Sequence, residues 1–272
     1  MTGPLYRQIA DDLRRRIESG ELKAGVQLPT EDQLMESRHA SRSTVRGALK
    51  ELATRGLVYT LHGKGTFVTE QVSPIVTSLT RDPKTGGGGG EGPAYTSEVA
   101  AIGRSANASG FRLEIMKARP AVARSLQIPD GTEVILRHQE RYVDGLAWSS
   151  QTSYYPRSLS SRAPRLLDTR NIEEGTVAYM TEQGIRQAGY RDAIQVRTPN
   201  AEETAYFDLP ADGHVQVVEI YRVGFDQLEN PVRLTITVYR ADRNRFIINV
   251  GDVPIYGSSK LTGALLSRDH YL

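Results

Sequence analysis

No residue of this 272-residue sequence is a cysteine, and no stretch of it is a long hydrophobic run. Without cysteine the chain has no disulfide, no thiolate metal site and no cysteine nucleophile. No window approaches the roughly 18 consecutive apolar residues of a membrane span, and the first residues lack the basic and apolar segments of a signal peptide. We therefore expect a soluble protein of the cytoplasm with no membrane partner.

Patterns of catalytic and metal-binding residues are also lacking. The five histidines lie far apart, without the paired spacing of metal ligands. Five consecutive glycines at 86–90 are not followed by the Lys and Ser or Thr of a phosphate-binding loop, and no serine lies in a Gly-x-Ser-x-Gly motif. We expect no metal site, no cofactor and no enzymatic activity.

The positive charge of the sequence is concentrated in its first quarter. The formal net charge is +2, and residues 1–70 hold 11 Lys and Arg against 9 Asp and Glu. The remaining residues hold 23 of each sign, so the whole excess lies in this first segment. An excess of two does not by itself distinguish a nucleic-acid-binding surface from an ordinary solvated one, so the pattern of residues has to decide.

The length exceeds that of one average domain, and a shift in composition marks a boundary. The stretch from Pro83 to Pro93 is dominated by glycine, a composition that forms flexible coil rather than a core. We expect a first domain over residues 1–70, a glycine-rich linker over 71–96, a second domain over 97–250 and a C-terminal tail over 251–272.

Helical signals dominate the first domain. Apolar residues recur at every fourth position from Leu5 to Ile17, which predicts a first helix. Thr30, with Gln33 three residues later, is typical of a capping box and predicts the start of a second helix. Ser41 is a candidate N-cap for a third helix. The strands predicted to follow these helices are 57–61 and 66–68.

The third helix has two distinct faces. Val45, Leu49 and Leu52 form an apolar stripe, and Arg42 and Arg46 lie on the opposite face. In a helix-turn-helix the first residues of the second helix meet base edges, and an arginine can donate two hydrogen bonds to guanine. An arginine pair on an exposed helix is, taken singly, usually only solvated. The order of helix, capped helix, arginine-headed helix and basic hairpin favours DNA binding.

The neighbouring hydroxyls and the hairpin turn complete the predicted interface. The hydroxyls of Ser43 and Thr44 are placed to reach phosphate. Glycines in the hairpin turn allow close approach of the backbone to a duplex, and the lysine between them would contact phosphate. The turn consists of His62, Gly63, Lys64 and Gly65.

The second domain has a different composition. Four stretches rich in β-branched and aromatic residues predict strands over 134–142, 148–154, 215–225 and 231–239. Helical patterns occur at 121–126, 176–183 and 201–207. The chain as a whole is therefore predicted to be of the α+β class, with a mixed second domain.

Five segments of residues 4–69 form a recognisable pattern: Pro4-Leu-Tyr-Arg-Gln-Ile9, Leu28-Pro-Thr-Glu31, Ser41-Arg-Ser-Thr-Val-Arg46, Leu49-Lys-Glu-Leu52 and Gly56-Leu-Val58 through Gly63-Lys-Gly-Thr-Phe-Val68. With this pattern the residues resemble the winged helix-turn-helix of GntR-family transcriptional regulators. The resemblance implies that Arg42 and Arg46 read bases, that Thr44 contacts the DNA backbone, and that His62 with Gly63 forms the wing tip in the minor groove.

This sequence departs from the family pattern at two places. Asp32 stands where many relatives have an arginine that contacts DNA, so this contact is absent or the operator is read differently. Arg38-His39-Ala40 replaces the usual aromatic-Gly-Val before the third helix. We expect His39 to adopt the left-handed conformation that the glycine would otherwise supply.

Six parts of residues 98–248 form a recognisable pattern: Leu126–Gly131, Glu140–Gly145, Ser153–Pro156, Arg197–Glu203 with Leu209-Pro210, Pro231-Val232 and Tyr239–Arg243. With this pattern the segment resembles the UTRA domain that defines the HutC subfamily. The resemblance implies a chorismate-lyase-like sheet that binds a small effector, and a homodimer. Carried over by position, the effector-contacting residues are Arg141, Gln151, Thr176, Arg233 and Tyr239.

The predicted effector site differs from that of sugar-phosphate-responsive relatives. Gln139 stands where a second phosphate-binding arginine is usual, and Gln151 and Arg233 replace two acids that accept bonds from sugar hydroxyls. Arg141 with Arg233, expected to lie near each other, would suit an anion. The competing interpretation of these two arginines is a surface strand charge or a salt bridge of a dimer.

The sequence as a whole predicts a homodimeric one-component transcriptional regulator that represses. It would bind double-stranded palindromic operator DNA and be released by a small, anionic metabolite. One alternative is a constitutive repressor, such as a plasmid-transfer control protein, whose effector pocket is vestigial. The other is a lyase-like enzyme, which the absence of a cluster of acid, base and nucleophile disfavours.

Overall fold

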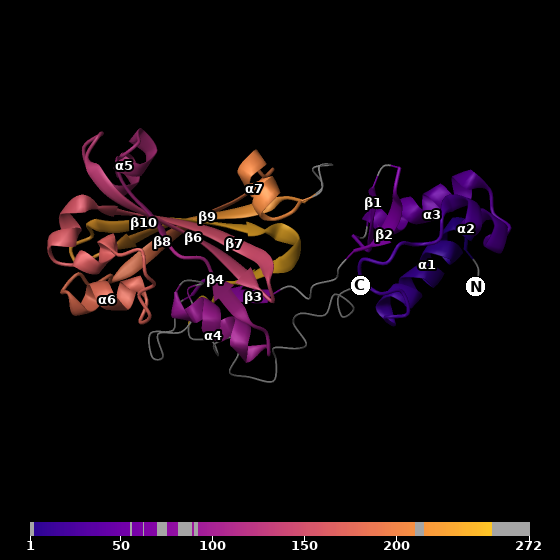
Figure 1. The fold of residues 1–272 in the computed structure, drawn as a ribbon, viewed down its shortest axis with the longest axis horizontal. Coiled ribbons are helices and arrows are strands. Elements are labelled where there is room, and N and C mark those ends of the chain that lie inside the picture. The colour runs from indigo at the N-terminus through magenta and orange to yellow at the C-terminus, as the bar shows by residue number, and fades with distance from the viewer. Residues whose placement is uncertain are drawn as a thin grey trace. The chain divides into compact units, whose positions relative to one another are not determined.

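The computed structural model of the chain divides into two compact units, Met1–Ser73 and Pro74–Leu272, each of which is described by itself (Figure 1). The structure describes residues 3–54, 56–61, 63–69, 75–80, 89, 92–209 and 215–251.

The first unit is a winged helix. Its strands β1 and β2 pair in antiparallel register, and residues before α2 extend this hairpin: Gln27 bridges Phe67, and the Leu28 amide donates to the Thr66 carbonyl at 2.7 Å. The predicted helices and hairpin are therefore confirmed. The elements are α1 (Leu5–Glu18), α2 (Glu31–Arg38), α3 (Arg42–Thr54), β1 (Val58–Leu61) and β2 (Gly65–Val68).

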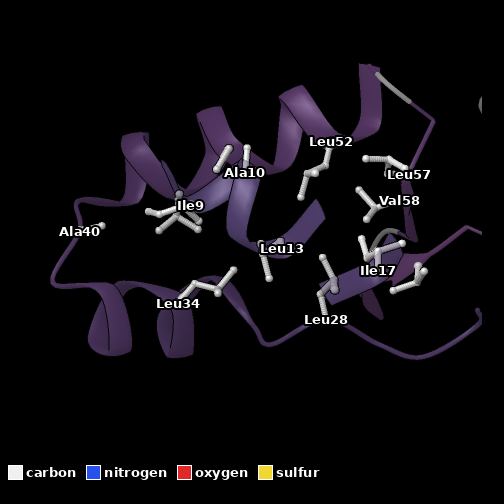
Figure 2. Packing of buried hydrophobic residues seen from close by; sticks show 13 residues of the cluster. Ile9, Ala10, Leu13, Ile17, Leu28, Leu34, Ala40, Leu52, Leu57 and Val58 are labelled. Atoms are coloured by element: carbon white, nitrogen blue, oxygen red, sulfur yellow. The ribbon is translucent and has the colours of Figure 1, made fainter. Parts of the chain in front are cut away.

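The core of the first unit is built from the apolar stripes of its helices (Figure 2). Leu13 of α1 and Val45 of α3 are completely buried, and Leu34 of α2 and Leu28 close the core from the other side. Burial of these stripes removes apolar surface from water and sets the packing of α3 on α1. The face of α3 opposite its apolar stripe is thereby left toward solvent.

The ends of the helices follow local rules. The Thr30 hydroxyl accepts from the Gln33 amide at 3.2 Å, and the Gln33 side chain accepts from the Thr30 amide at 2.8 Å, which completes the predicted capping box. His39 ends α2 in the left-handed conformation, with φ of 47°. The expectation for this histidine is confirmed, and the turn between α2 and α3 forms without glycine.

The second unit is centred on a seven-stranded antiparallel sheet. Its strand order is β4-β6-β7-β10-β9-β8, and β5 also pairs with β6. The four predicted strands correspond to β6, β7, β9 and β10, so the mixed α and β architecture is confirmed. The bounds are β4 (Ala106–Ala108), β5 (Arg112–Lys117), β6 (Glu133–Val143), β7 (Leu146–Pro156), β8 (Gly189–Arg197), β9 (Val217–Phe225) and β10 (Pro231–Arg240).

Helices cover both faces of this sheet (Figure 1). The helices α5 (Pro120–Leu126) and α7 (Ala201–Tyr206) lie on one face, and α4 (Pro93–Ala101) and α6 (Thr176–Glu182) lie on the other. The three helices α5, α6 and α7 were predicted, whereas α4 was not. Three short 3-10 helices are η1 (Arg157–Ser161), η2 (Pro164–Leu167) and η3 (Ala241–Arg243).

Part of the predicted linker 71–96 has regular structure. Residues Ile75–Ser78 form β3, which pairs in parallel with β11 (Asn244–Ile247), and α4 begins at Pro93. The pairing supplies hydrogen-bond partners for the backbone N–H and C=O groups of β3. Because the partner strand lies about 170 residues away, the composition of the linker could not indicate it. Within the glycine run, Gly89 donates its amide to the Ser78 carbonyl at 2.8 Å. The other glycines of the run, and residues 252–272 of the predicted tail, lie outside the described residues.

Candidate functional site

The exposed face of α3 carries two arginines. The side chains of Arg42 and Arg46 are 56% and 64% exposed, whereas Val45 and Ala48 between and beside them are completely buried. The predicted division of α3 into a packed face and a free face is therefore confirmed. The guanidinium group of an arginine on such a face can donate two hydrogen bonds to guanine.

Both arginines are held by acids from the first turn of α2. The Arg42 guanidinium lies 2.7 Å from an oxygen of Asp32, and Arg46 Nε lies 3.0 Å from Glu31. The sequence marked Asp32 as a departure from the family pattern, but it did not reveal this pairing. Exposed ion pairs contribute about 0–1 kcal/mol, so the arginines can exchange these partners for bases at little cost.

The hydroxyls at the start of α3 form a small network. The Ser41 hydroxyl caps the helix by accepting from the Thr44 amide at 3.2 Å, as predicted. It also lies 2.9 Å from the hydroxyl of Ser43 and 2.8 Å from that of Thr44. Ser43 and Thr44 thus lie beside the two arginines at the helix start, where phosphate contacts are expected.

The wing turn is fixed by a residue that the sequence did not single out. The Gln27 side chain donates to the Lys64 carbonyl at 2.8 Å. Gly65 has φ of 118°, a conformation that residues with a side chain rarely adopt, so glycine is favoured here. Lys64 is exposed at the turn, next to Gly63 with φ of 73°. His62 lies outside the described residues.

The second unit contains a cavity of about 300 Å³ between its sheet and the helices α4 and α6. Four of the five predicted effector residues line this cavity, as does Gln139. They come from three strands and from the start of α6, although they are far apart in the sequence: Arg141, Gln151, Thr176 and Arg233.

The structure places Tyr239 elsewhere. It is not among the residues that line the cavity, and it packs instead with Leu79, Val218 and Phe246, the last at a ring-centroid distance of 5.0 Å. The reason is the pairing of β3 with β11, which covers this end of the sheet face. We therefore leave Tyr239 out of the effector site.

Two further arginines line the cavity, Arg137 of β6 and Arg222 of β9. Both were missed by sequence reasoning. Register aligns Arg137 with Ser153, Ser153 with Thr235, and Thr235 with Arg222, so the two arginines point to the same sheet face. A signal existed in the alternation of Arg137, Gln139 and Arg141 along a strand that was predicted from the sequence. The four arginines of the cavity are at most 4% exposed: Arg137, Arg141, Arg222 and Arg233.

Arg137 holds the chain segment that precedes α6. One of its terminal nitrogens donates to the carbonyls of Arg165, Leu166 and Asp168, and the other to the carbonyl of Arg170 at 3.2 Å. Its guanidinium also stacks on Phe111, with the central carbon 4.1 Å from the ring centroid. Burial lowers the pKa of the Arg137 guanidinium. This arginine is engaged with the protein itself.

Arg222 links the cavity to the segment around β3. Its guanidinium forms a bidentate ion pair with Asp192, with distances of 2.7 and 2.6 Å, and donates to the carbonyls of Leu79 and Gly89. The Tyr190 ring stacks on the same guanidinium at 3.9 Å. Charge-assisted bonds of this kind fix the position of a buried cation.

Arg141 is held by side chains from β7 and α4. Its guanidinium donates to Gln151 Oε1 and lies 5.2 Å from the centre of the Tyr95 ring. Burial raises the pKa of Tyr95 to about 12, against the smaller opposing effect of the Arg141 charge. Tyr95 therefore stays neutral and donates to the Tyr142 carbonyl at 2.6 Å.

Arg141 and Arg233 do not lie next to each other, contrary to expectation. Arg141 pairs with Ser149, and Ser149 pairs with Tyr239, six residues along β10 from Arg233. With a rise of roughly 3.3 Å per residue and about 4.8 Å between strands, their Cα atoms are about 22 Å apart. The two arginines mark opposite ends of the cavity face.

The cavity lining is strongly positive. Among the described residues that line the cavity, the one acid is Glu174, which pairs with Arg165 at 2.5 Å. This ion pair lowers the pKa of Glu174 and keeps it ionised. Arg222 is already paired with Asp192, but the buried guanidinium groups of Arg137, Arg141 and Arg233 still outnumber the carboxylate of Glu174, which favours an anionic ligand.

Comparison with known proteins assigns a family to each of the two units. The profile of bacterial regulatory proteins of the gntR family matches residues 5–68, and that of the UTRA domain matches residues 102–245. The chain is 27% identical over 244 residues to the HTH-type transcriptional regulator GgaR of Escherichia coli K12, with 90% of both chains covered. It is 43% identical over 88 residues to the HTH-type transcriptional repressor NagR of Bacillus subtilis, covering 31% of this chain and 36% of NagR. The crystal structure of PhnF from Mycobacterium smegmatis has 25% identity and a TM-score of 0.55, and covers 90% of this chain and 100% of PhnF.

A winged helix with an exposed arginine face and a second unit with a ligand cavity define the class of one-component DNA-binding regulators. The chain belongs to the GntR family of transcriptional regulators and carries a UTRA domain. The first domain implies DNA binding and the second implies binding of a small-molecule effector. The chain is thus a transcription regulator and not an enzyme. Among its described residues, no helix is long and apolar enough to cross a membrane.

Proposed function

We propose that the chain is a cytoplasmic, homodimeric repressor of the HutC subfamily. Its two winged helices would bind an inverted-repeat operator, and a small anionic metabolite in the UTRA cavity would release it. The observation that carries the DNA-binding part is the pair of exposed arginines at the start of α3. The similarity of the chain to NagR, a transcriptional repressor, supports repression over activation.

The proposed mechanism is geometric. Two recognition helices bind an inverted repeat tightly only when their separation matches the spacing of the half-sites, near one helical turn or roughly 34 Å. An effector that favours another separation weakens binding by its differential affinity for the two states. By linkage, operator DNA must weaken effector binding by the same factor.

The proposal is tested by footprinting the DNA upstream of the gene, together with sedimentation of the free protein. A dimer should protect an inverted repeat whose half-sites are about one helical turn apart. A monomer at micromolar concentration that binds a single half-site would contradict this. Operator binding that no anionic metabolite releases would instead favour the constitutive repressor, an alternative kept open by the replaced acids at Gln151 and Arg233.

Asp32 is expected to weaken DNA binding in general. Its side chain is 77% exposed beside Arg42, so its negative charge repels DNA phosphates that approach the start of α3. Asp32→Asn should tighten binding to operator and unrelated duplex alike, about twofold to fivefold, the equivalent of roughly 0.5–1 kcal/mol. Titration of both duplexes at low and high salt measures this, and the gain should shrink as salt screens the charge.

Glu36→Gln is the matched control, because it removes an equal charge from the last turn of the same helix α2. A gain confined to the operator would show that Asp32 acts on base reading instead of on general electrostatics. Weaker binding by Asp32→Asn would show that the acid is needed to position Arg42.

A further inference from the structure

The cavity carries its positive charge at two separate ends. Arg233 aligns with Gly224 of β9, two residues from Arg222, so the Cα atoms of these two arginines are about 8 Å apart. Arg141 lies at the other end of the same face, about 22 Å from Arg233 between Cα atoms. The fourth arginine, Arg137, is engaged by four main-chain carbonyls between these ends.

Apart from Arg137, whose guanidinium is already engaged by four main-chain carbonyls, the surface between the two ends is lined by uncharged polar side chains. Gln139, Gln151 and Ser153 line it from β6 and β7, and the ring of Tyr155 lies among them. The Gln139 side chain donates to the Ser109 carbonyl at 2.9 Å, and Ser153 bonds to Thr235 at 3.0 Å. A ligand that crosses this region needs no charge there.

We propose that the effector is an elongated molecule with an anionic group at each end, one held by Arg141 and the other by Arg233. This inference rests on the proposed function and names the chemical class of its effector. Each anionic end gains charge-assisted hydrogen bonds from a buried guanidinium, and two charges offset the excess of arginine over acid better than one. A compact anion with a single acidic group reaches only one end.

The test uses α,ω-dicarboxylates from succinate to suberate and the monocarboxylates of the same chain lengths. Binding to the full-length free protein is followed by calorimetry and by the shift of the melting temperature. The affinity of the diacids should pass through a maximum with chain length, and the best diacid should bind about tenfold or more tightly than its monoacid. This arm needs no variant.

Two variants test whether Arg141 and Arg233 each bind one carboxylate of the diacid. Arg141→Gln and Arg233→Gln should each reduce the affinity of the best diacid to that of its monoacid. Arg124→Gln is the control: it removes an equal charge from an exposed position of α5, at the opposite face of the sheet. This variant should leave the difference in affinity between the diacid and its monoacid unchanged. If a glutamine variant fails to fold, Arg141→Lys or Arg233→Lys retains the charge and should weaken the diacid without abolishing its advantage.

Three outcomes overturn the inference: monoacids that bind as tightly as diacids at every length, a diacid advantage that survives both arginine variants, or no binding by any member of the series. Footprinting of the operator without ligand separates this failure from failure of the proposed function. Protection that is released by a compact monoanion would leave the proposed function standing and remove only the dianionic effector.

Discussion

Replacing Arg137 by methionine is expected to lower the free energy of unfolding of the UTRA domain by at least about 3 kcal/mol. The side chain is 1% exposed and donates to the carbonyls that precede α6. Methionine fills similar space but donates nothing, and each buried acceptor left unsatisfied costs about 1–3 kcal/mol. The stacking on Phe111 is lost as well.

Urea unfolding followed by tryptophan fluorescence measures this loss. Trp148 is the one tryptophan of the sequence, and it is 3% exposed in the core of the second unit, so its emission reports this domain. Arg124→Met, at an exposed position of α5, is the matched control. A loss below about 1 kcal/mol in Arg137→Met would mean that its carbonyl partners find water or other donors, and that Arg137 does not hold the segment before α6.

Arg42→Ala and Arg46→Ala are each expected to weaken operator binding by about 1–3 kcal/mol for each half-site, or roughly fivefold to 150-fold. Loss of the ion pairs with Asp32 and Glu31 changes little, because both pairs are exposed. The loss should therefore come from base contacts, and each variant should relax specificity at one base pair.

The measurement is a titration of the operator and of operators mutated at single base pairs. Lys64→Ala should weaken binding to all sequences alike and reduce the dependence of affinity on salt, because a lysine on phosphate carries no sequence information. Arg15→Ala removes an equal charge from α1, where Arg15 pairs with Asp12, and serves as the control. Unchanged operator affinity in a folded Arg42→Ala protein would show that α3 is not the recognition helix.

The DNA-binding unit could be predicted almost completely from the sequence because its signals are local. The capping box of Thr30 and Gln33, the cap at Ser41 and the apolar stripe through Val45 act within one or two helical turns. The left-handed conformation of His39 was expected from the resemblance to the family, in which a glycine stands at this position. The pairing of Arg42 with Asp32 was beyond prediction, because it depends on the angle between two helices.

The effector cavity was predicted only in part, since strand register decides which side chains meet. The sequence by itself, through its resemblance to the UTRA domain, determined that Arg141, Gln151 and Arg233 belong to one site. Only the tertiary structure decided that Arg222 joins them and that Arg141 and Arg233 lie at opposite ends. The pairing of β3 with β11 likewise removed Tyr239 from the cavity. Each of these outcomes depends on backbone pairing between segments distant in the chain, which no local pattern of residues encodes.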